Sequence, residues 1–509
     1  MNGPAGRRPG LAGRRPTLDL LDPSGVDRIL DEALAVLRDP GVRVADPEAR
    51  SLLEGVGAAV RDGVARIPES AVRAALATVP RAFSLHSRDG SPAVRYGAGE
   101  VAFDPGSCGI AVLDPETGEH RPSTAADLVR LVAVAERLPA YAAQSTAVVC
   151  SDVPAELGDR YRLLLVLLGS DKPVVTGAFK ADGLGPMIDL LAADAGGAEG
   201  LRARPRAVFD VCPSPPLDWT SFASRCLIGL ARAGVPAQLV SMPLAGGAAP
   251  VALAGSVVQH AAESLAGIVI HQAAAPGAPI VWGGAPAILD MRIGAAPMGA
   301  IETAMLTAGN AAVGRSLGLP THGYLGATDA KLVDAQAGME SATTALVGAL
   351  AGIDLVSGAG MLDSLRCQSA EKLVIDAESI ASVLRLVRGI ALPEGSLGLD
   401  AIREAGFAGR FLELPETRRR FREEQHLPSP VVDRGSLRAW LEAGGGDMFA
   451  RARSRVDALL AMPAPPALDP ARARELVGRV GSALRAVGFD RLPGVAPETS
   501  GRGKSQDVV

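Results

Sequence analysis

The feature that most constrains the fold is an alternation of short β-rich runs with longer helical stretches rich in Ala, Leu and Gly. The β-rich runs occupy residues 144–150, 172–179, 206–213, 237–246, 279–286, 320–327 and 354–360. Strands that alternate with helices are typical of βα units, in which the strands are parallel and the helices cover them. Because each run is followed by a polar or Gly-rich loop, the spacing predicts a TIM (β/α)8 barrel, a fold of about 250 residues.

Two points about this barrel stay open in the sequence. An open doubly wound sheet is the alternative α/β fold, although no GxGxxG follows the first strand. The eighth strand is not obvious either. It comes from "EVAFDPGS", upstream of the other runs, or from the segment after residue 385.

The rest of the chain flanks the predicted barrel. We expect a disordered tail at residues 1–16, a region of helices and β-hairpins at 17–135, and the barrel at 136–390. A helical extension at 391–497 packs beside the barrel, and a second disordered tail covers 498–509.

Composition excludes several classes of protein. The net charge of −5 argues against nucleic-acid binding, which needs a basic face. The five cysteines are scattered, with no CxxC pair and no metal-ligand spacing, so we expect a cytoplasmic protein without a metal site. The N-terminus lacks the apolar stretch of a secretory signal, and polar residues interrupt the apolar runs before a bilayer is spanned.

Side chains that follow the strands are the candidates for a site, because function collects at the carboxyl ends of the strands in a parallel barrel. They are Trp219, Met242, Trp282, Asp290, Arg292, Glu302 and Tyr324. For the three aromatic residues, simple core filling is a serious alternative.

The loop after the sixth strand is unusually polar. The window "GATDAKLVDAQAGMES", residues 326–341, holds Asp329, Lys331, Asp334, Gln336 and Glu340. Asp334 is placed to cap the next helix, on which Gln336 and Glu340 share one face. The alternative is a solvated helix face beside a loop ion pair worth under ~1 kcal/mol.

Four stretches of the chain resemble one known family. They are "SMPLAGGAAPVALAGSVVQHAAE", "GGAPAILDMRIGAAPMGAIE", "TDAKLVDAQAGMES" and "SGAGMLDS". Together they are similar to the trimethylamine methyltransferase family, in order, from about residue 17 to 435. The chain departs from the family pattern at Asp210, where Asn is expected, and at Ala261.

The resemblance implies a TIM-barrel enzyme that moves a methyl group from a methylated amine to Co(I) of a separate corrinoid protein. The corrinoid (cobalamin) would be carried by that partner, with none held tightly by this chain. Some family members carry pyrrolysine near residues 326–341, whereas this sequence has standard residues only. It therefore looks like the pyrrolysine-free branch, which includes glycine betaine methyltransferases.

A quaternary ammonium substrate needs no general acid, because its nitrogen already leaves as a neutral amine. The enzyme has to hold the cation with one methyl group aimed at Co(I). We expect Trp219, Trp282 and Tyr324 to surround the cation. The other expected site residues are Asp329, Lys331 and Glu340 as catalytic groups, Lys331 or Arg292 for a betaine carboxylate, and Met242, Asp290, Glu302 and Gln336 as further lining.

Two other functions remain possible for such a chain. One is a barrel lyase or aldolase that uses Lys331 as a Schiff-base amine, although Asp329 and Asp334 nearby would keep that amine protonated. The other is a non-catalytic protein that binds quaternary amines. A homo-oligomer is expected, with the subunit number undetermined.

Overall fold

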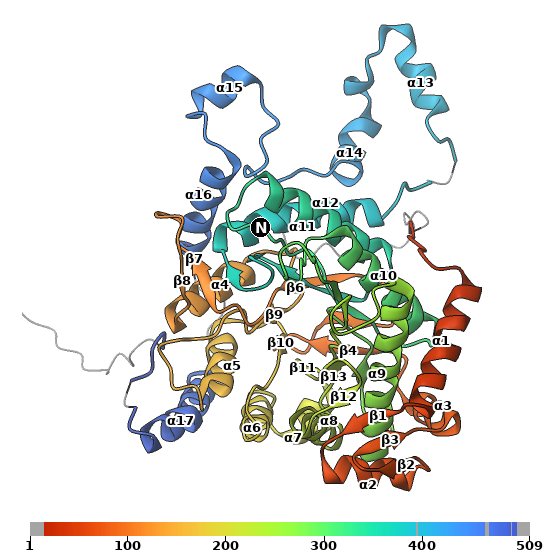
Figure 1. Ribbon diagram of the computed structural model, residues 1–509. Coiled ribbons are helices and arrows are strands. Elements are labelled where there is room, and N and C mark those ends of the chain that lie inside the picture. Colours follow the sequence, from red (N-terminus) through yellow and green to blue (C-terminus); the bar gives the residue numbers. More distant parts are fainter. Residues whose placement is uncertain (1–14, 393–394, 464–467, 490, 496–509) are drawn as a thin grey trace, which may run out of the picture.

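The computed structural model of the chain is a mixed α/β structure, with parallel strands inside and helices around them (Figure 1). It describes residues 15–392, 395–463, 468–489 and 491–495. The two expected tails therefore lie outside the described residues, except for residues 15 and 16.

Two sheets of three or more strands are wholly parallel. The larger sheet contains β9 (Gln144–Ser145), β10 (Val174–Thr176), β11 (Ala207–Val211), β13 (Ala237–Leu239) and β15 (Ile280–Val281), paired in that order. The smaller contains β17 (His322–Tyr324), β18 (Leu355–Ala359) and β6 (Ala102–Pro105). All seven predicted β-rich runs thus contain a parallel strand, and "EVAFDPGS" contributes an eighth, β6.

Backbone contacts join the two sheets at both seams. At one seam Trp282, directly after β15, forms a parallel bridge with Thr321, and the His322 N–H donates to the Trp282 carbonyl at 2.9 Å. At the other, the Ala142 N–H donates to the Phe103 carbonyl at 2.8 Å. The parallel strands therefore begin at residue 102 rather than at 136, and follow one another as β6, β9, β10, β11, β13, β15, β17 and β18.

One long helix follows each of these strands. In chain order they are α4 (Ala125–Glu136), α5 (Gly158–Gly169), α6 (Leu184–Asp194), α8 (Ser221–Ala233), α9 (Leu253–Ala274), α10 (Ile301–Ser316), α11 (Ala335–Leu350) and α12 (Ala370–Val387). A short α7 (Ala198–Ala203) follows α6. In the described part of the chain, α9 alone is long and apolar enough to cross a membrane, but 78% of its apolar window is buried inside the protein, as in a core helix.

A β-hairpin fills the amino end of the strands. It consists of β4 (Phe83–His86) and β5 (Pro92–Tyr96), and its turn region bonds to the loops that precede β10 and β11. Leu85, Val94 and Tyr96 are fully buried against inward-facing strand residues such as Val208 and Leu355. The interior is closed at this end, so the opposite end, where the strands' carboxyl ends meet, is the one available for a site. We call that end the mouth.

The remaining small elements form two groups: one precedes the hairpin, and the other lies in the loops that follow the parallel strands. Before the hairpin come α1 (Pro23–Arg38), β1 (Val42–Val44), α2 (Pro47–Gly55), β2 (Ala59–Arg61), β3 (Val64–Arg66) and α3 (Glu69–Thr78), of which α1, α2 and α3 pack on α9. At the mouth lie β7 (Ala111–Leu113), β8 (His120–Pro122), β12 (Asp218–Trp219), β14 (Leu244–Ala245), β16 (Ala287–Ile288), β19 (Met361–Leu362) and β20 (Cys367–Gln368).

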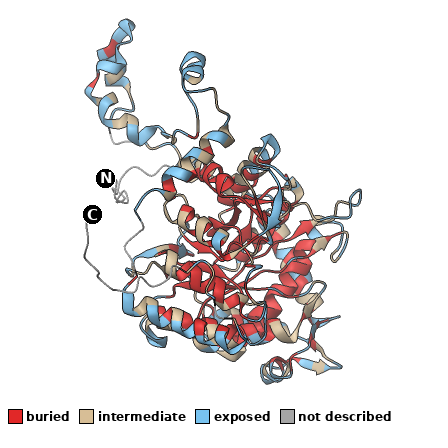
Figure 2. Cartoon of the chain, turned by 90° about the vertical axis from the view of Figure 1, so that its left-hand side faces the viewer, coloured by how far each residue is buried: buried red, intermediate tan, exposed pale blue. Residues whose placement is uncertain are grey.

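The C-terminal region is helical, and only part of it packs beside the helices that follow the parallel strands. Its elements are α13 (Leu399–Ala405), the 3-10 turns η1 (Gly406–Ala408) and η2 (Phe411–Glu413), α14 (Pro415–Glu424), α15 (Leu437–Glu442), α16 (Met448–Leu460) and α17 (Pro470–Ala486). Of these, α16 contacts α12 and α4, and α17 contacts α5 and α6. The helices α13 to α15 project from the body and are mostly exposed, whereas burial is concentrated in the central strands and the helices around them (Figure 2).

Candidate active site

A carboxylate lies inside the ring of strands, at the level of the mouth. Asp210 of β11 and Gln238 of β13 are register partners, so their side chains face the same side. The Gln238 amide donates to Asp210 Oδ1 at 2.6 Å, and the Tyr324 hydroxyl of β17 donates to Asp210 Oδ2 at 2.7 Å. The Tyr96 hydroxyl, from the hairpin below, donates to Gln238 Oε1 at 3.1 Å. Four strands thus hold one carboxylate in a fixed orientation.

No basic side chain of the described residues forms a hydrogen bond or ion pair with Asp210. Burial raises the pKa of Asp210 to about 6, while the hydrogen bonds from Tyr324 and Gln238 act in the opposite direction. At neutral pH the group is therefore mostly ionised, and its negative charge is stabilised by neutral donors only. A buried charge of this kind is energetically unfavourable unless a counter-charge is supplied.

A guanidinium group that has its own counter-ion lies beside Cys108. Arg162 of α5 is 1% exposed and donates to Asp159 Oδ1 and to the Thr146 carbonyl, each at 3.3 Å. Its guanidinium carbon lies 4.7 Å from the centre of the Phe179 ring, a cation–π contact. Arg162 is therefore neutralised by Asp159, and its donors stabilise the loops after β9 and β10.

Small polar groups connect these two charged centres. The Ser107 hydroxyl is 3.4 Å from the Tyr324 hydroxyl and 3.2 Å from Cys108 Sγ, and an Arg162 nitrogen lies 3.5 Å from the same sulfur. Cys212, two residues after Asp210 on the same face, is exposed. We refer to Asp210, Gln238, Tyr324, Ser107 and Cys108 together as the Asp210 cluster.

The polar window at 326–341 forms a second network, which ties three loops together. Asp329 accepts hydrogen bonds from the Met298 and Gly299 N–H groups at 2.7 and 3.0 Å, and from the Ser364 hydroxyl at 2.6 Å. Glu340 accepts from the Asp329 N–H at 2.8 Å, and also from Thr328 and Gln336. These carboxylates are occupied by donors from the loops after β15, β17 and β18. We call this set, Asp329 and Glu340 with their donors, the Asp329 network.

One glycine shows how closely this network is packed. A Cβ atom on Gly299 would lie 2.2 Å from Glu340 Oε2, well inside van der Waals contact. Met298 lies next to it and packs in the same apolar cluster as Tyr324. The Asp329 network therefore lies directly beside the Asp210 cluster and fixes the loops that surround it.

Three other residues of the window lie at its outer edge. Lys331 is 67% exposed, and its ammonium donates to the Asp329 carbonyl at 2.7 Å and lies 3.5 Å from Asp363. Gln336 is exposed and donates to Glu340 at 2.8 Å. Asp334 caps α11 by accepting from the Ala337 N–H, as predicted. The loop ion pair thus exists, but it joins Lys331 to Asp363 rather than to Asp329.

The two tryptophans are not beside Tyr324, contrary to expectation. Trp282 is 1% exposed, its indole N–H donates to the Asn310 carbonyl of α10, and its ring meets His260 of α9 edge-on at 5.5 Å. Trp219 is fully buried and donates to the Glu263 carbonyl of α9. Both rings fill the layer between strands and helices, so the expected three-ring cage is not assembled.

The remaining expected site residues lie around the outside of the mouth. Asp290 and Arg292 pair with each other at 2.6 Å, and Arg292 is 88% exposed. Met242 is 42% exposed, and Glu302 lies in the first turn of α10. In the described part of the chain, none of them forms a hydrogen bond or ion pair with the Asp210 cluster. Among the described residues there is also no group of three or more His, Cys, Asp or Glu side chains that could hold a metal ion.

Several residues of this site were missed at the sequence level. Asp210 was noticed only as a departure from a family pattern, and Gln238, Ser107, Cys108 and Arg162 were not proposed. A usable signal existed in the strand "AVFDV": Val208, Asp210 and Cys212 alternate, so an acidic residue shares the inward face of an apolar strand. An acidic residue on the inward face of a strand is rare without a partner, so this pattern indicates that Asp210 is a site residue.

Comparison with known proteins identifies relatives over most of the chain. The trimethylamine methyltransferase (MTTB) family profile matches residues 3–481. The trimethylamine methyltransferase MttB of Methanosarcina thermophila is 33% identical over 439 residues, which is 83% of this chain and 89% of that protein. The glycine betaine methyltransferase of Desulfitobacterium hafniense is 28% identical over 459 residues, 89% of this chain and 95% of that protein. The crystal structure of the Methanosarcina barkeri monomethylamine methyltransferase (MtmB) aligns with a TM-score of 0.48 at 13% identity, covering 86% of this chain and 90% of that one.

Proposed function

Because the chain belongs to the trimethylamine methyltransferase family, we propose that it removes a methyl group from a quaternary or tertiary methylammonium compound at the Asp210 cluster. The acceptor in this proposal is the Co(I) of a corrinoid carried by a separate protein. Glycine betaine, which the name of one relative specifies, is the first compound to test.

We further infer that the two parallel sheets form a single closed (β/α)8 barrel. The support is the pair of seams, at Trp282–Thr321 and Ala142–Phe103, together with one long helix after each of the eight parallel strands. In such a barrel the functional groups lie where the carboxyl ends of the strands converge. Asp210, Tyr324 and Ser107 lie at these ends on three different strands or strand-following loops.

The single observation that supports a cationic substrate is the ionised Asp210, held by neutral donors and without a cationic partner among the described residues. A bound methylammonium group supplies the missing counter-charge. The Tyr324 ring beside it adds an aromatic surface, of the kind that favours quaternary ammonium groups by about 1–2 kcal/mol once desolvated. Cys212 and Met242 add soft, polarizable surface at the open end.

In the proposed reaction the bond between nitrogen and one methyl carbon breaks, and its electron pair stays on nitrogen. The corrinoid, in its Co(I) form, supplies the nucleophile that takes up the methyl group. The residues of this chain then have three tasks: to hold the ammonium at Asp210, to aim one methyl toward the mouth, and to keep the loops around it fixed. The Asp329 network performs the last task, since its carboxylates fasten three of these loops.

The positive charge on nitrogen disappears as the methyl group leaves. A carboxylate next to that nitrogen therefore stabilises the bound substrate more than the transition state. Asp210 is thus expected to act in binding and orientation, so that replacing it raises KM much more than it lowers kcat.

The acceptor protein needs a surface around the mouth. Loops at this end expose large apolar side chains, which fits docking of a second protein: Ile110, Phe179, Met242, Met291, Ile293, Leu332 and Met339. A cytoplasmic location fits the five unpaired cysteines and a reaction that consumes reduced cobalt. The expected homo-oligomer remains a prediction.

The Schiff-base alternative receives no support from the surroundings of Lys331. Its ammonium is mostly in water and bonded to a carbonyl and a carboxylate, whereas a Schiff-base lysine is enclosed beside its substrate. The relatives are named as methyltransferases, and the chain is a methyltransferase of that family. A non-catalytic binder of quaternary amines is distinguished by the experiment that follows.

The test is to incubate the purified protein with cob(I)alamin and one methylated amine at a time, and to follow the absorbance of methylcobalamin. Glycine betaine, carnitine, choline, proline betaine and trimethylamine form the panel. Methylcobalamin that depends on one of these amines, and that is reduced in Asp210→Ala but not in the exposed control Asp400→Asn, is the expected result. A protein that binds one of the amines yet never forms methylcobalamin, also with its corrinoid partner present, would contradict the proposal and favour the non-catalytic binder.

A further inference from the structure

The charges around the Asp210 cluster discriminate between two kinds of methylammonium compound. A net cation, such as choline or tetramethylammonium, carries only the positive charge. A zwitterion, such as glycine betaine, carries a carboxylate within a few ångströms of its nitrogen. Since the first is attracted by Asp210 and the second is both attracted and repelled, the local charge balance decides which is preferred.

The buried counter-charge that a betaine carboxylate would require is already taken. Arg162 is the buried guanidinium beside the cluster, and it is bonded to Asp159 at 3.3 Å and stacked on Phe179. A substrate carboxylate would have to share the charge of Arg162 with Asp159, which also accepts the Phe179 N–H at 2.7 Å and the Lys180 N–H at 3.1 Å. Two carboxylates beside one guanidinium leave a net negative charge in the interior, which is unfavourable.

The basic residues first expected to bind a betaine carboxylate lie elsewhere. Lys331 is 67% exposed and pairs with Asp363, and Arg292 is 88% exposed and pairs with Asp290. Two more basic residues of the mouth loops, Lys180 and Arg366, are exposed to water, where salt screens their charge. Attraction by such groups is weak compared with repulsion by a buried carboxylate.

A second acidic group of the interior also offers an anion no counter-charge, because burial raises the pKa of Asp104 well above its usual value. Asp104 of β6 is fully buried, accepts the Ser357 hydroxyl at 2.6 Å, and its other oxygen, Oδ2, has no hydrogen-bond partner in the described structure. Ser357 in turn contacts His322 at 3.0 Å, and His322 packs edge-on against Tyr324. The interior below Tyr324 therefore offers an incoming anion no donor that carries a charge.

We propose that Asp210 makes this site select methylammonium compounds with a net positive charge over zwitterionic betaines. The proposal rests on the proposed function, because it assumes that the Asp210 cluster is where the methylammonium group binds. It narrows the substrate class to amines that lack a carboxylate next to the nitrogen, such as choline-like or simple tetraalkylammonium compounds.

Binding measurements test this without any methyl transfer. Calorimetric titration of the wild-type protein with tetramethylammonium, choline and glycine betaine should show the two cations binding roughly 10- to 100-fold more tightly than the zwitterion. A neutral analogue of choline, 3,3-dimethylbutan-1-ol, should bind more weakly than choline by a similar factor. Equal or tighter binding of glycine betaine would overturn the proposal.

The variant Asp210→Asn connects the selectivity to one charge. It should weaken choline binding roughly 10- to 100-fold and leave the affinity for glycine betaine nearly unchanged. The ratio of the two affinities should therefore approach one. In the matched surface control, Asp400→Asn, the preference should be retained. A preference that survives in a folded Asp210→Asn protein would also overturn the proposal.

A second variant protects the test against a folding defect. Tyr324→Phe keeps the ring but removes the hydroxyl that donates to Asp210, and it should weaken choline binding only a few-fold while keeping the preference for cations. Loss of the preference in Tyr324→Phe with Asp210 intact would contradict the assignment to the carboxylate.

The two proposals fail in different ways. Methylcobalamin formed from glycine betaine in preference to choline would leave the proposed function standing and refute the selectivity. Tight, Asp210-dependent binding of choline without methylcobalamin would support the selectivity and refute the proposed function.

Discussion

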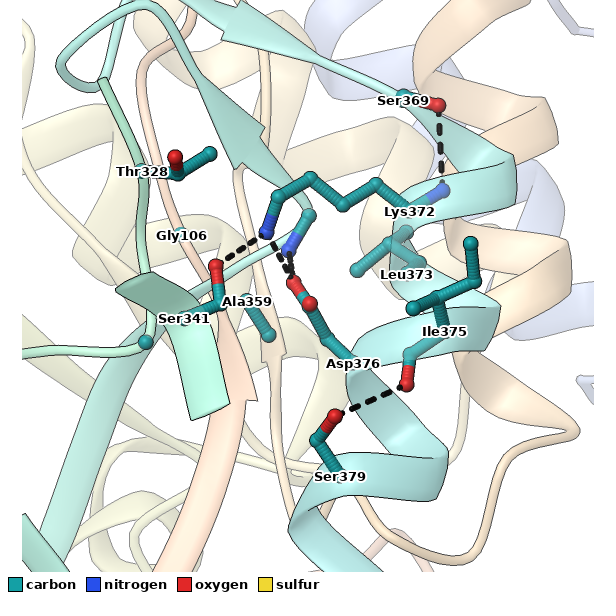
Figure 3. Close-up of polar contacts among 12 residues, drawn as sticks. Gly106, Thr328, Ser341, Ala359, Ser369, Lys372, Leu373, Ile375, Asp376 and Ser379 are labelled. Atoms are coloured by element: carbon teal, nitrogen blue, oxygen red, sulfur yellow. Dashed lines mark hydrogen bonds and ion pairs between the residues drawn. The ribbon is translucent and has the colours of Figure 1, made fainter. Parts of the chain in front are cut away.

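Two carboxylates of this chain, the buried Asp376 and the partly exposed Asp210, have opposite surroundings. Asp376 of α12 accepts hydrogen bonds from the Lys372 ammonium at 2.6 Å and from the Gly360 N–H at 2.7 Å (Figure 3). The Lys372 ammonium also donates a hydrogen bond to the Ser341 hydroxyl of α11. Asp210, at the mouth, has only neutral donors from Gln238 and Tyr324. Burial raises the pKa of both carboxyl groups, but for Asp376 the ammonium beside it opposes that shift.

The presence or absence of a basic partner distinguishes Asp376, whose charge is part of the folded structure, from Asp210, whose charge is available to a ligand. Lys372 and Asp376 lie on one helix, four residues apart, with side chains 1% and 5% exposed, so the chain itself supplies the counter-charge of this carboxylate. At Asp210 no basic side chain of the described residues supplies a counter-charge, and an unpaired charge inside a protein is unfavourable. The cationic substrate that we propose would supply it.

The largest change in stability is expected when Asp376 loses its basic partner and is left unpaired, like Asp210. Lys372→Met removes the ammonium and leaves Asp376 buried alone, which should lower the free energy of unfolding by about 3–5 kcal/mol. Urea denaturation followed by circular dichroism measures this loss. The double variant Lys372→Met with Asp376→Leu should recover most of the stability. A loss below about 1 kcal/mol in the single variant would mean that the pair is not structural.

A smaller effect of opposite sign is expected at Asp210. The folded-state pKa of about 6 lies above the usual value near 3.8, so the ionised carboxylate destabilises the fold at pH values above about 6, and this penalty disappears as pH falls below about 4. Asp210→Asn should therefore raise the free energy of unfolding by about 1–3 kcal/mol at pH 7.5 and by little at pH 4. Denaturation at the two pH values checks this. A destabilised variant at pH 7.5 would show that the charge is needed for folding.

The positions of the parallel strands could be predicted from the sequence, because they follow from hydrophobic period and spacing. Every predicted β-rich run contains a parallel strand, and the eighth strand is one of the two segments considered, "EVAFDPGS" as β6. The boundary at residue 136 was placed too late, because β6 and α4 form a βα unit although hairpin strands lie between them. Alternating hydrophobicity does not distinguish a hairpin from the first strand of a parallel set.

The site was harder to predict, because position along a strand does not fix the side on which a side chain lies. Trp282 follows β15 as expected, but Val281 packs inside with the hairpin, so its neighbour Trp282 must face the helices. The same alternation places Val208 and Asp210 on the inner face. Strand alternation, counted from an inward-facing valine, excludes Trp282 from the predicted site and includes Asp210.

A third prediction concerns how the affinity for a cation depends on pH through the ionisation of Asp210. Because protonation removes the charge of Asp210, the affinity for tetramethylammonium should fall roughly tenfold between pH 7 and pH 5, with its midpoint near 6. Burial lowers the pKa of His260 to about 4 and of His322 to about 3, so these neighbours stay neutral over that range. Calorimetry across the range provides the measurement. A titration that persists unchanged in Asp210→Asn would assign it to another group.

The smallest effect is expected for the exposed pair at the rim. Lys331→Ala removes an ammonium that lies mostly in water, 3.5 Å from Asp363, and should change the free energy of unfolding by less than about 1 kcal/mol. Borohydride with a carbonyl substrate should leave no adduct on the wild-type protein. A trapped adduct at Lys331 would support the Schiff-base alternative.

The hairpin β4–β5 has a consequence for the order of events. Since Leu85, Val94 and Tyr96 block the amino end of the strands, the amine of our proposal would enter and leave through the same opening that faces the proposed acceptor. An acceptor protein docked over that opening would trap the amine. In the proposed reaction, amine binding would therefore precede docking, and the demethylated amine would leave only after the acceptor.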